Sequence, residues 1–152
     1  MTQRELPRVT RVAAYALCVD ADSRILLCRI APGYWKGIGS WTLPGGGIDF
    51  REAPGDAALR ELREETGLIG RLEEFAGVHS VSGVWTRPDG GEEEFHAIRL
   101  VYRVAVTGGE LTMEIGGSTD LCARLTRDEA EALPLVDLAE YGLRLAFGGA
   151  SD

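Results

Sequence analysis

One short helix with a clear start and stop most constrains what this chain can fold into. Pro54 is a suitable first helical residue and Gly67 is a typical terminator, so the sequence predicts a helix over 54–66. Ala53, at the expected N-cap, lacks the side-chain oxygen that usually stabilises a helix start. One side of the helix carries a stripe of Ala58, Leu59, Leu62 and Thr66. This side is expected to pack on a sheet, which leaves the opposite side free to face a cleft.

Three glutamates crowd that opposite side close to the end of the helix. Glu61, Glu64 and Glu65 are spaced i, i+3 and i+4, so their carboxylates share one face. Their mutual repulsion costs roughly 0.2 to 0.5 kcal/mol per pair, and each anion in a last turn opposes the helix dipole. Arg60 and Arg63 offer one explanation, a surface helix with mixed ion pairs. The other is a divalent cation, because clustered carboxylates are the hard oxygen ligands that Mg²⁺ or Mn²⁺ prefers.

Length and charge limit the classes of partner. The chain has 152 residues, which suits a single domain, 1–152, with its own core. It carries 16 Lys and Arg against 24 Asp and Glu, giving a net charge of −8. This balance argues against a broad basic surface for a nucleic acid polymer or an anionic membrane. A small phosphorylated ligand stays compatible with it if a metal neutralises the charge locally.

The cysteines suggest a cellular compartment. Cys18, Cys28 and Cys122 are odd in number, far apart and embedded in apolar runs, so we expect reduced core residues rather than a disulfide or a zinc site. A cytoplasmic location follows from that expectation. The apolar run at 12–19 is interpreted as a buried strand rather than a secretory signal, and no segment is long enough to cross a bilayer.

Strand and helix patterns alternate along the rest of the chain. Two β pairs are expected, the first a hairpin with a tight turn at Asp20–Ser23. Their strands lie at 9–19 with 24–30, and at 75–86 with 94–106. A strand near 121–125 then leads to a short helix that begins at the capping-box residue Thr126, and a final helix covers about 135–147. This alternation predicts a mixed α/β layer structure.

Residues 46–68 read GGIDFREAPGDAALRELREETGL, and they resemble the signature box of the Nudix hydrolase family (MutT-like). Every fixed position of the box is filled, by Gly46, Glu52, Arg60, Glu61, Glu64, Glu65 and Gly67, with Leu62 and Leu68 at its aliphatic positions. The resemblance implies an α/β/α sandwich built on a mixed β-sheet. It also implies divalent-metal-dependent hydrolysis of a nucleoside diphosphate linked to another group. Arg51 and Ala53 depart from residues often found in the box, which affects the local loop and the helix start.

The resemblance assigns roles inside this box. Glu64 and Glu65 would be primary ligands of Mg²⁺ or Mn²⁺, with the Gly45 carbonyl as a further ligand. Glu61 would either complete the metal shell or take the proton from the attacking water. Glu52 and Arg60 would form a supporting ion pair that positions Glu61 without binding metal.

Residues outside the box supply further candidates. In this family a later loop can furnish the general base or a metal ligand, and Glu114 is the first candidate here. Asp120 and the run Glu92–Glu94 come after it, and most of these residues are expected to be surface acids. Arg29 is a candidate for a substrate phosphate, with a surface ion pair as the alternative.

Aromatic and histidine side chains complete the set. Tyr34 and Trp35 are candidates for stacking on a nucleobase, while Trp41 is expected in the core. His79 and His96 lie in strand patterns and are expected to be structural.

Together these features predict a hydrolase that cleaves a phosphoanhydride of a nucleotide-like substrate. Markers of substrate subfamilies are absent from the sequence, which leaves nucleoside triphosphates, including oxidised ones, as the default. The alternatives are a catalytically silent Nudix module that senses a ligand or binds a protein, and a structural domain with an acidic helix. A homodimer is left open.

Overall fold

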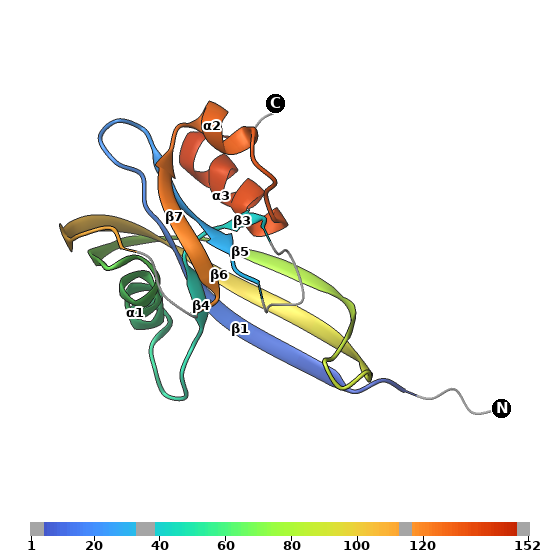
Figure 1. Ribbon diagram of the computed structural model, residues 1–152. Helices are drawn as coiled ribbons and strands as arrows, with labels where there is room; N and C mark the ends of the chain where they lie inside the picture. The colour runs from blue at the N-terminus through green and yellow to red at the C-terminus, as the bar shows by residue number, and fades with distance from the viewer. Residues whose placement is uncertain (1–4, 33–38, 113–116, 149–152) are drawn as a thin grey trace.

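Two β-sheets form the centre of the computed structural model, which describes residues 5–32, 39–112 and 117–148 (Figure 1). The larger sheet has the order β4-β1-β6-β5, and its strands are β1 (Arg8–Leu17), β4 (Gly45–Gly47), β5 (Leu68–Thr86) and β6 (Glu92–Gly109). It is mixed, because β1 runs parallel to β6 but antiparallel to β4, and β5 is antiparallel to β6. The smaller antiparallel sheet has the order β3-β2-β7, from β3 (Trp41–Thr42), β2 (Ile25–Ile30) and β7 (Thr119–Leu125).

Helices cover both faces of the larger sheet. They are α1 (Pro54–Thr66), α2 (Arg127–Glu131) and α3 (Asp137–Phe147). Leu17 and Val101 point to the side of α3 and join its core, whereas Ala16 and Val104 point to the other side and pack with Leu62 of α1. The expected α/β/α sandwich on a mixed sheet is therefore confirmed, with the core divided between the two faces of the sheet.

The helix termini follow the local sequence. Ala53 caps α1 without a side-chain hydrogen bond, and Gly67 ends the helix in the left-handed conformation, with φ of 79°. Thr126 forms the predicted capping box with Glu129 at the start of α2. No helix in the described ranges is both long and apolar enough to span a membrane.

The first predicted hairpin is wrong in its pairing. The turn forms, since Ser23 N–H donates to Asp20 O at 3.0 Å, but β1 and β2 then separate into different sheets. Among the described residues, the two segments that flank the turn pair with each other only at the isolated bridge between Val19 and Ile25. The long partner of β1 is β6, because parallel pairing buries β1 in the middle of the larger sheet.

Several predicted boundaries also shift. The second pair is longer than expected, since β5 starts at Leu68 directly after α1. The glycine run at Gly45–Gly47 is a strand, which periodicity cannot indicate because glycine has no side chain. Helix α3 begins at Asp137 rather than at Leu135, since Leu135 forms a bridge with Trp41.

The expectation of three reduced cysteines is wrong. Cys28 and Cys122 form a disulfide across the β2–β7 pair, where they lie directly opposite each other in the register. Cys18 is free and buried, and burial raises the pKa of its thiol to about 12, so this thiol stays protonated. With a disulfide present, the cysteines no longer support a cytoplasmic location.

Candidate functional site

The acidic side of α1 faces the glycine strand β4. Its opposite side packs on the sheet through fully buried Ala58 and Leu62. Gly46 allows the Glu61 carboxylate to approach closely, because a Cβ on Gly46 would lie 2.9 Å from Glu61 Cδ and 3.0 Å from either carboxylate oxygen. The Gly45 N–H donates to Glu65 Oε1 at 3.3 Å. Two of the three glutamates thus approach a strand without side chains, and the missing Cβ atoms are what allow this close approach.

Arg60 gathers the carboxylates of the site around one guanidinium. It binds Glu52 in a bidentate manner, with Nε 2.8 Å from Oε2 and Nη2 2.9 Å from Oε1. Its Nη1 donates to Glu61 Oε1 at 3.1 Å and to Glu64 Oε2 at 3.2 Å. Nη2 also donates to the Gly47 carbonyl at 3.0 Å. The expected Glu52–Arg60 ion pair is present, and the same guanidinium links α1 to the start of the loop after β4.

This network fixes the protonation of its members. The hydrogen bonds from Arg60, with the backbone N–H of Asp49, lower the pKa of Glu52 to about 2. The carboxylates in turn raise the pKa of Arg60, which stays charged. Both groups are therefore ionised across the physiological range, as a positioning ion pair requires.

The three glutamates of the cluster occupy different environments. Glu64 is exposed, with 52% of its side-chain surface accessible, whereas the Glu61 side chain is only 17% accessible. Burial raises the pKa of Glu61, and the nearby Glu64 charge adds to this, against the lowering effect of Arg60. A carboxylate with a raised pKa accepts a proton more readily than an ordinary glutamate, which agrees with the role of proton acceptor predicted for Glu61.

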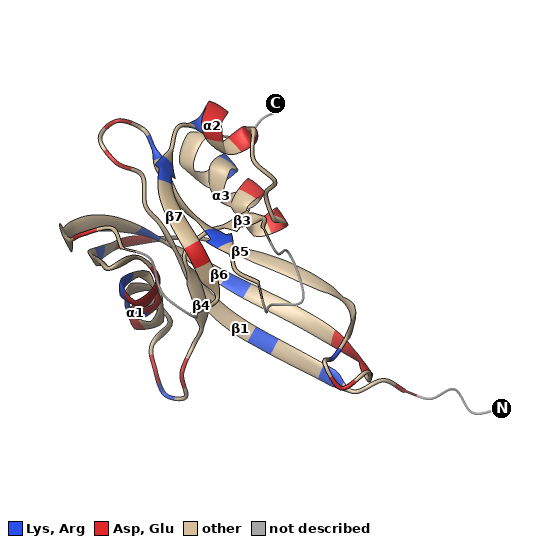
Figure 2. Cartoon of the chain, viewed as in Figure 1, with Lys and Arg blue, Asp and Glu red and all other residues tan. Residues whose placement is uncertain are grey.

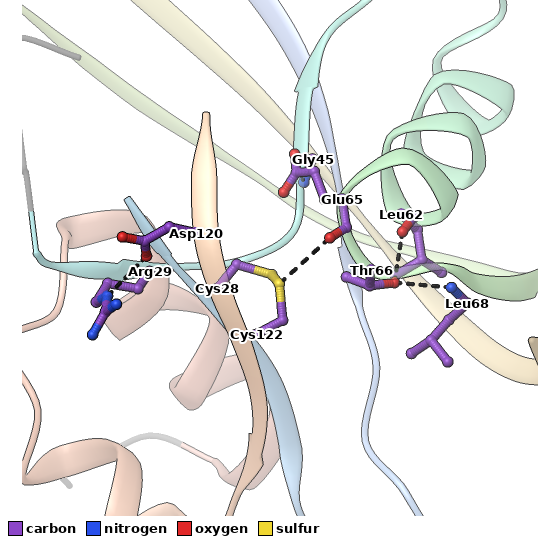
Figure 3. Close-up of a disulfide and its surroundings, with 9 residues drawn as sticks. All are labelled: Cys28, Arg29, Gly45, Leu62, Glu65, Thr66, Leu68, Asp120 and Cys122. Atoms are coloured by element: carbon purple, nitrogen blue, oxygen red, sulfur yellow. Dashed lines mark hydrogen bonds and ion pairs between the residues drawn. A yellow bond between two sulfur atoms is a disulfide. The ribbon is translucent and has the colours of Figure 1, made fainter. Parts of the chain in front are cut away.

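Glu65 is anchored at the end of the helix, next to the disulfide (Figure 3). Its residue surface is only 2% accessible, and Cys122 Sγ lies 3.8 Å from its carbonyl oxygen. Thr66 closes the last turn, since its hydroxyl donates to Leu62 O at 2.6 Å and accepts from Leu68 N–H at 3.1 Å. The disulfide and these hydrogen bonds hold the backbone of Glu65 against β7.

The donor set fits a hard divalent cation. Glu61, Glu64 and Glu65 supply carboxylate oxygens only, and Glu61 and Glu65 both lie against β4. Among the described residues no three acidic, histidine or cysteine side chains already converge on one point as a cage, since Arg60 draws Glu61 and Glu64 towards itself. Mg²⁺ commonly takes one or two carboxylates, waters and substrate phosphates instead of an all-protein cage, so this arrangement suits it.

The other predicted residues divide into three groups. Arg29 pairs with Asp120 at 2.8 Å across β2 and β7, which is the surface ion pair weighed as its alternative (Figure 3). Trp41 is buried in the core, as expected. Tyr34, Trp35 and Glu114 lie outside the described residues.

The two histidines are held by hydrogen bonds within the sheet. His96 Nε2 lies 2.8 Å from the Ser80 hydroxyl, and His79 Nδ1 lies 3.3 Å from Arg99 Nη1. The ring of His79 also lies 5.3 Å from that of Tyr141 on α3. These contacts support the structural interpretation of both residues.

Two polar residues near the site were missed by the sequence analysis. Tyr15 lies on β1 beneath Gly45 and hydrogen-bonds to Arg99, and its pKa is raised chiefly by burial. Electrostatic interactions with Glu61 and Glu65 raise that pKa further, which places the phenol near the acidic cluster. Both residues sit inside apolar strand patterns, so no motif marks them in the sequence.

Comparison with known sequences identifies similar proteins over most of the chain. The family model described as "NUDIX domain" matches residues 9–146. An ADP-ribose pyrophosphatase of Methanocaldococcus jannaschii is 37% identical over 93 residues, which cover 61% of this chain and half of that protein. A nucleoside triphosphatase NudI of Escherichia fergusonii is 30% identical over 131 residues, 84% of this chain and 85% of that one.

Solved structures share the fold. A MutT NUDIX hydrolase from Burkholderia pseudomallei superposes with a TM-score of 0.71 at 25% identity, over 90% of this chain and 97% of that one. A MutT protein from Methanosarcina mazei gives a TM-score of 0.71 at 19% identity, over 95% and 96% of the two chains. These structures have the same arrangement of sheets and helices.

Proposed function

The chain belongs to the NUDIX domain family, and from this premise we propose that it is a divalent-metal-dependent hydrolase of the pyrophosphate bond in a nucleoside diphosphate joined to another group. The observation that carries the proposal is the set of three carboxylates, Glu61, Glu64 and Glu65, presented by one helix face beside the glycine strand. Relatives named as an ADP-ribose pyrophosphatase and a nucleoside triphosphatase support the reaction class.

Each residue of the site has a distinct part in this proposal. Glu61, Glu64 and Glu65 would hold Mg²⁺ or Mn²⁺, with the Gly45 carbonyl as a further oxygen. When bound, the cation would neutralise phosphate charge and favour deprotonation of the attacking water. Glu61 is suited to accept that proton, because its pKa is raised while it remains hydrogen-bonded to Arg60.

Glu52 and Arg60 act as positioning residues. Arg60 binds Glu52, Glu61 and the Gly47 carbonyl at once, so it sets the distance between α1 and the strand that faces it. This keeps the Glu61 carboxylate in one orientation before the substrate arrives, which lowers the reorganisation needed during the reaction.

The substrate proposed by default is a nucleoside triphosphate, including an oxidised one. Arg29 stands at the end of β2 and would contact a phosphate only if it left Asp120, to which it is bound at 2.8 Å. Tyr34 and Trp35 remain predicted base-stacking residues. A homodimer also stays a prediction, as does the cytoplasmic location.

A panel of nucleoside triphosphates and nucleoside diphosphate derivatives, assayed for phosphate or pyrophosphate release in Mg²⁺ or Mn²⁺, tests this function. We expect cation-dependent hydrolysis that Glu64→Gln and Glu65→Gln each reduce by about 10²-fold or more while the fold is kept. Glu140→Gln, an exposed glutamate of α3, is the control and should leave the rate unchanged. Binding of a nucleotide without turnover would instead favour the sensing module, and no binding at all would refute the proposal.

A further inference from the structure

The disulfide between Cys28 and Cys122 lies where the smaller sheet meets the helix of the three glutamates. It joins β2 to β7 at positions that are directly opposite each other in the strand register. Figure 3 shows that it projects from this strand pair towards the last turn of α1, which contains Glu65. The disulfide is thus placed to connect the smaller sheet with the acidic site.

One sulfur of the disulfide contacts the backbone of a proposed cation ligand. Cys122 Sγ lies 3.8 Å from the carbonyl oxygen of Glu65. The carboxylate of the same residue accepts from the Gly45 N–H at 3.3 Å. A shift of the Glu65 carbonyl therefore changes where its carboxylate lies relative to β4.

Both sulfurs are enclosed by the core on the α1 side of the larger sheet. Cys28 is 0% accessible and Cys122 is 2% accessible. They belong to the same buried cluster as Leu62 and Leu68, which flank Glu65 in the chain. Protein interiors are close-packed, so the movement of one buried atom displaces its neighbours. A change at the sulfurs is therefore transmitted to the end of α1.

The sulfurs act on Glu65 through contact rather than charge. Between Asp120 and Arg124, β7 has no charged residue, and Figure 2 shows the middle of this strand without acidic or basic colouring. The disulfide is itself neutral. Its influence on the site therefore comes from where the sulfur atoms lie.

Reduction changes this contact in two ways. A dithiol reductant delivers two electrons and two protons, so the S–S bond breaks, each cysteine becomes a thiol and the reductant is oxidised to its own disulfide. The separated sulfurs then have to move apart to an ordinary contact distance. The Cys122 thiol also gains an S–H donor, which a disulfide sulfur lacks. Both changes fall on the atom that touches the Glu65 carbonyl.

The position of β7 in its sheet allows it to respond to the loss of the bond. The order β3-β2-β7 makes β7 an outer strand, with β2 as its strand neighbour in this sheet. Without the disulfide, the pair keeps its backbone hydrogen bonds and the partly exposed ion pair of Arg29 with Asp120. An outer strand can therefore shift away from α1 without disturbing another strand.

We infer that the Cys28–Cys122 disulfide positions Glu65 and makes the cation site sensitive to redox conditions, so that reduction to two thiols weakens cation binding. This inference rests on the proposed function, because it assumes that Glu65 binds the cation. Cys122 is a positioning residue in this arrangement, since it acts through the backbone of Glu65.

The test measures Mn²⁺ binding without nucleotide, by the electron paramagnetic resonance signal of free Mn²⁺, in the oxidised and the dithiothreitol-reduced wild type. The reductant is removed without air before the measurement. Titration of thiols in denaturant verifies the two states, with one thiol per chain expected before reduction and three after it. We expect reduction to raise the dissociation constant of Mn²⁺ by about 10-fold, as for the loss of a group that orients a metal ligand, and reoxidation to restore it.

Variants show whether the disulfide is responsible. The double variant Cys28→Ser with Cys122→Ser should bind Mn²⁺ as weakly as the reduced wild type and should not respond to dithiothreitol. Cys18→Ala should respond as the wild type does, because Cys18 is a free cysteine of the same buried cluster. A double variant with the affinity of the oxidised wild type overturns the inference.

A matched control separates positioning from a general loss of stability. Leu143 is buried in α3, on the opposite face of the larger sheet from α1, so Leu143→Ala destabilises the fold at a distance from Glu65. It should keep the Mn²⁺ affinity of the oxidised wild type. An equal loss of affinity in Leu143→Ala overturns the inference, because the effect then follows from stability alone.

Amide hydrogen exchange in the absence of cation reports the end of α1 directly. The Gly67 N–H donates to Arg63 O at 2.9 Å, and the Leu68 N–H donates to the Thr66 hydroxyl at 3.1 Å. Reduction should accelerate exchange of both amides by about 10-fold, as expected for a less stable local structure, and unchanged exchange overturns the inference. Equal Mn²⁺ affinity in the two redox states overturns the inference alone, whereas no Mn²⁺ binding in either state overturns the proposed function as well.

Discussion

Replacing Gly46 by alanine tests whether the position of the Glu61 carboxylate, rather than its charge alone, determines activity. The added Cβ would lie 2.9 Å from Glu61 Cδ and 3.0 Å from each carboxylate oxygen. Carbon atoms in ordinary contact are about 3.5–4.0 Å apart, so the carboxylate has to withdraw by roughly half an ångström or more. The end of a glutamate side chain rotates easily, and the backbone is expected to stay in place.

The expected result is a loss of activity without a comparable loss of stability. The withdrawn carboxylate lengthens its 3.1 Å hydrogen bond with Arg60 Nη1, and misplacement of a catalytic group by about 1 Å costs roughly 10²-fold in rate. We therefore expect kcat to fall by about 10- to 100-fold, while the free energy of unfolding changes by about 1 kcal/mol or less. Steady-state hydrolysis in Mg²⁺ and urea denaturation measure the two quantities.

Two other glycines serve as controls for this experiment. Gly45→Ala should reduce stability strongly, because its Cβ would clash with the backbone oxygen of Ala14 as well as with Tyr15. Gly108→Ala should change neither quantity, since its nearest neighbour, Ile69, is at an ordinary 3.9 Å. Full activity of Gly46→Ala with unchanged stability would refute the reasoning, as would a loss of stability equal to that of Gly45→Ala.

Three further predictions follow from the same contacts. Glu52→Gln should make stability less dependent on pH in acid. The depressed pKa of Glu52 contributes stability above about pH 4.5, and the wild type loses this stability as the pH falls to about 2. Urea midpoints of the two proteins between pH 5 and pH 2 measure the effect, and parallel curves would contradict it. Replacing Cys28 and Cys122 by serine removes a disulfide with a sequence separation of 94, and the free energy of unfolding should fall by about 2–4 kcal/mol. An unchanged free energy of unfolding would show that the pair is not bonded in solution. Leu62→Ala, at a fully buried position under α1, should cost about 2–5 kcal/mol in chemical denaturation, and a cost below 1 kcal/mol would show that α1 does not pack as described.

Local sequence rules predicted the helix that carries the glutamates of the site and the start of α2. The proline at the start of α1, the glycine after it and the capping box of α2 act within a few residues, and all three are found as expected. The spacing of Glu61, Glu64 and Glu65 likewise places them on one helix face regardless of the rest of the fold. Properties that depend on short-range geometry were therefore accessible from sequence alone.

Properties that depend on pairing between distant strands were not accessible. The disulfide exists because β2 and β7 place Cys28 directly opposite Cys122, and nothing near either cysteine specifies that register. The alignment of Arg99 with Ala13 has the same origin, since it requires the parallel pairing of β1 with β6. A strand pattern gives the face of a residue, but its neighbours across the sheet come only from the topology.

The three clustered glutamates show why burial matters more than spacing for assigning roles. Glu64 is exposed and pairs with Arg60, whereas Glu65 is enclosed and accepts a hydrogen bond from the Gly45 N–H. Glu61 lies between them in burial, and burial raises its pKa while Arg60 still orients it. A buried carboxylate that cannot move suits a fixed metal ligand, and a partly buried carboxylate with a raised pKa suits proton transfer. Because all three residues are glutamates, the side chain alone cannot distinguish their roles, and the local environment of each one does.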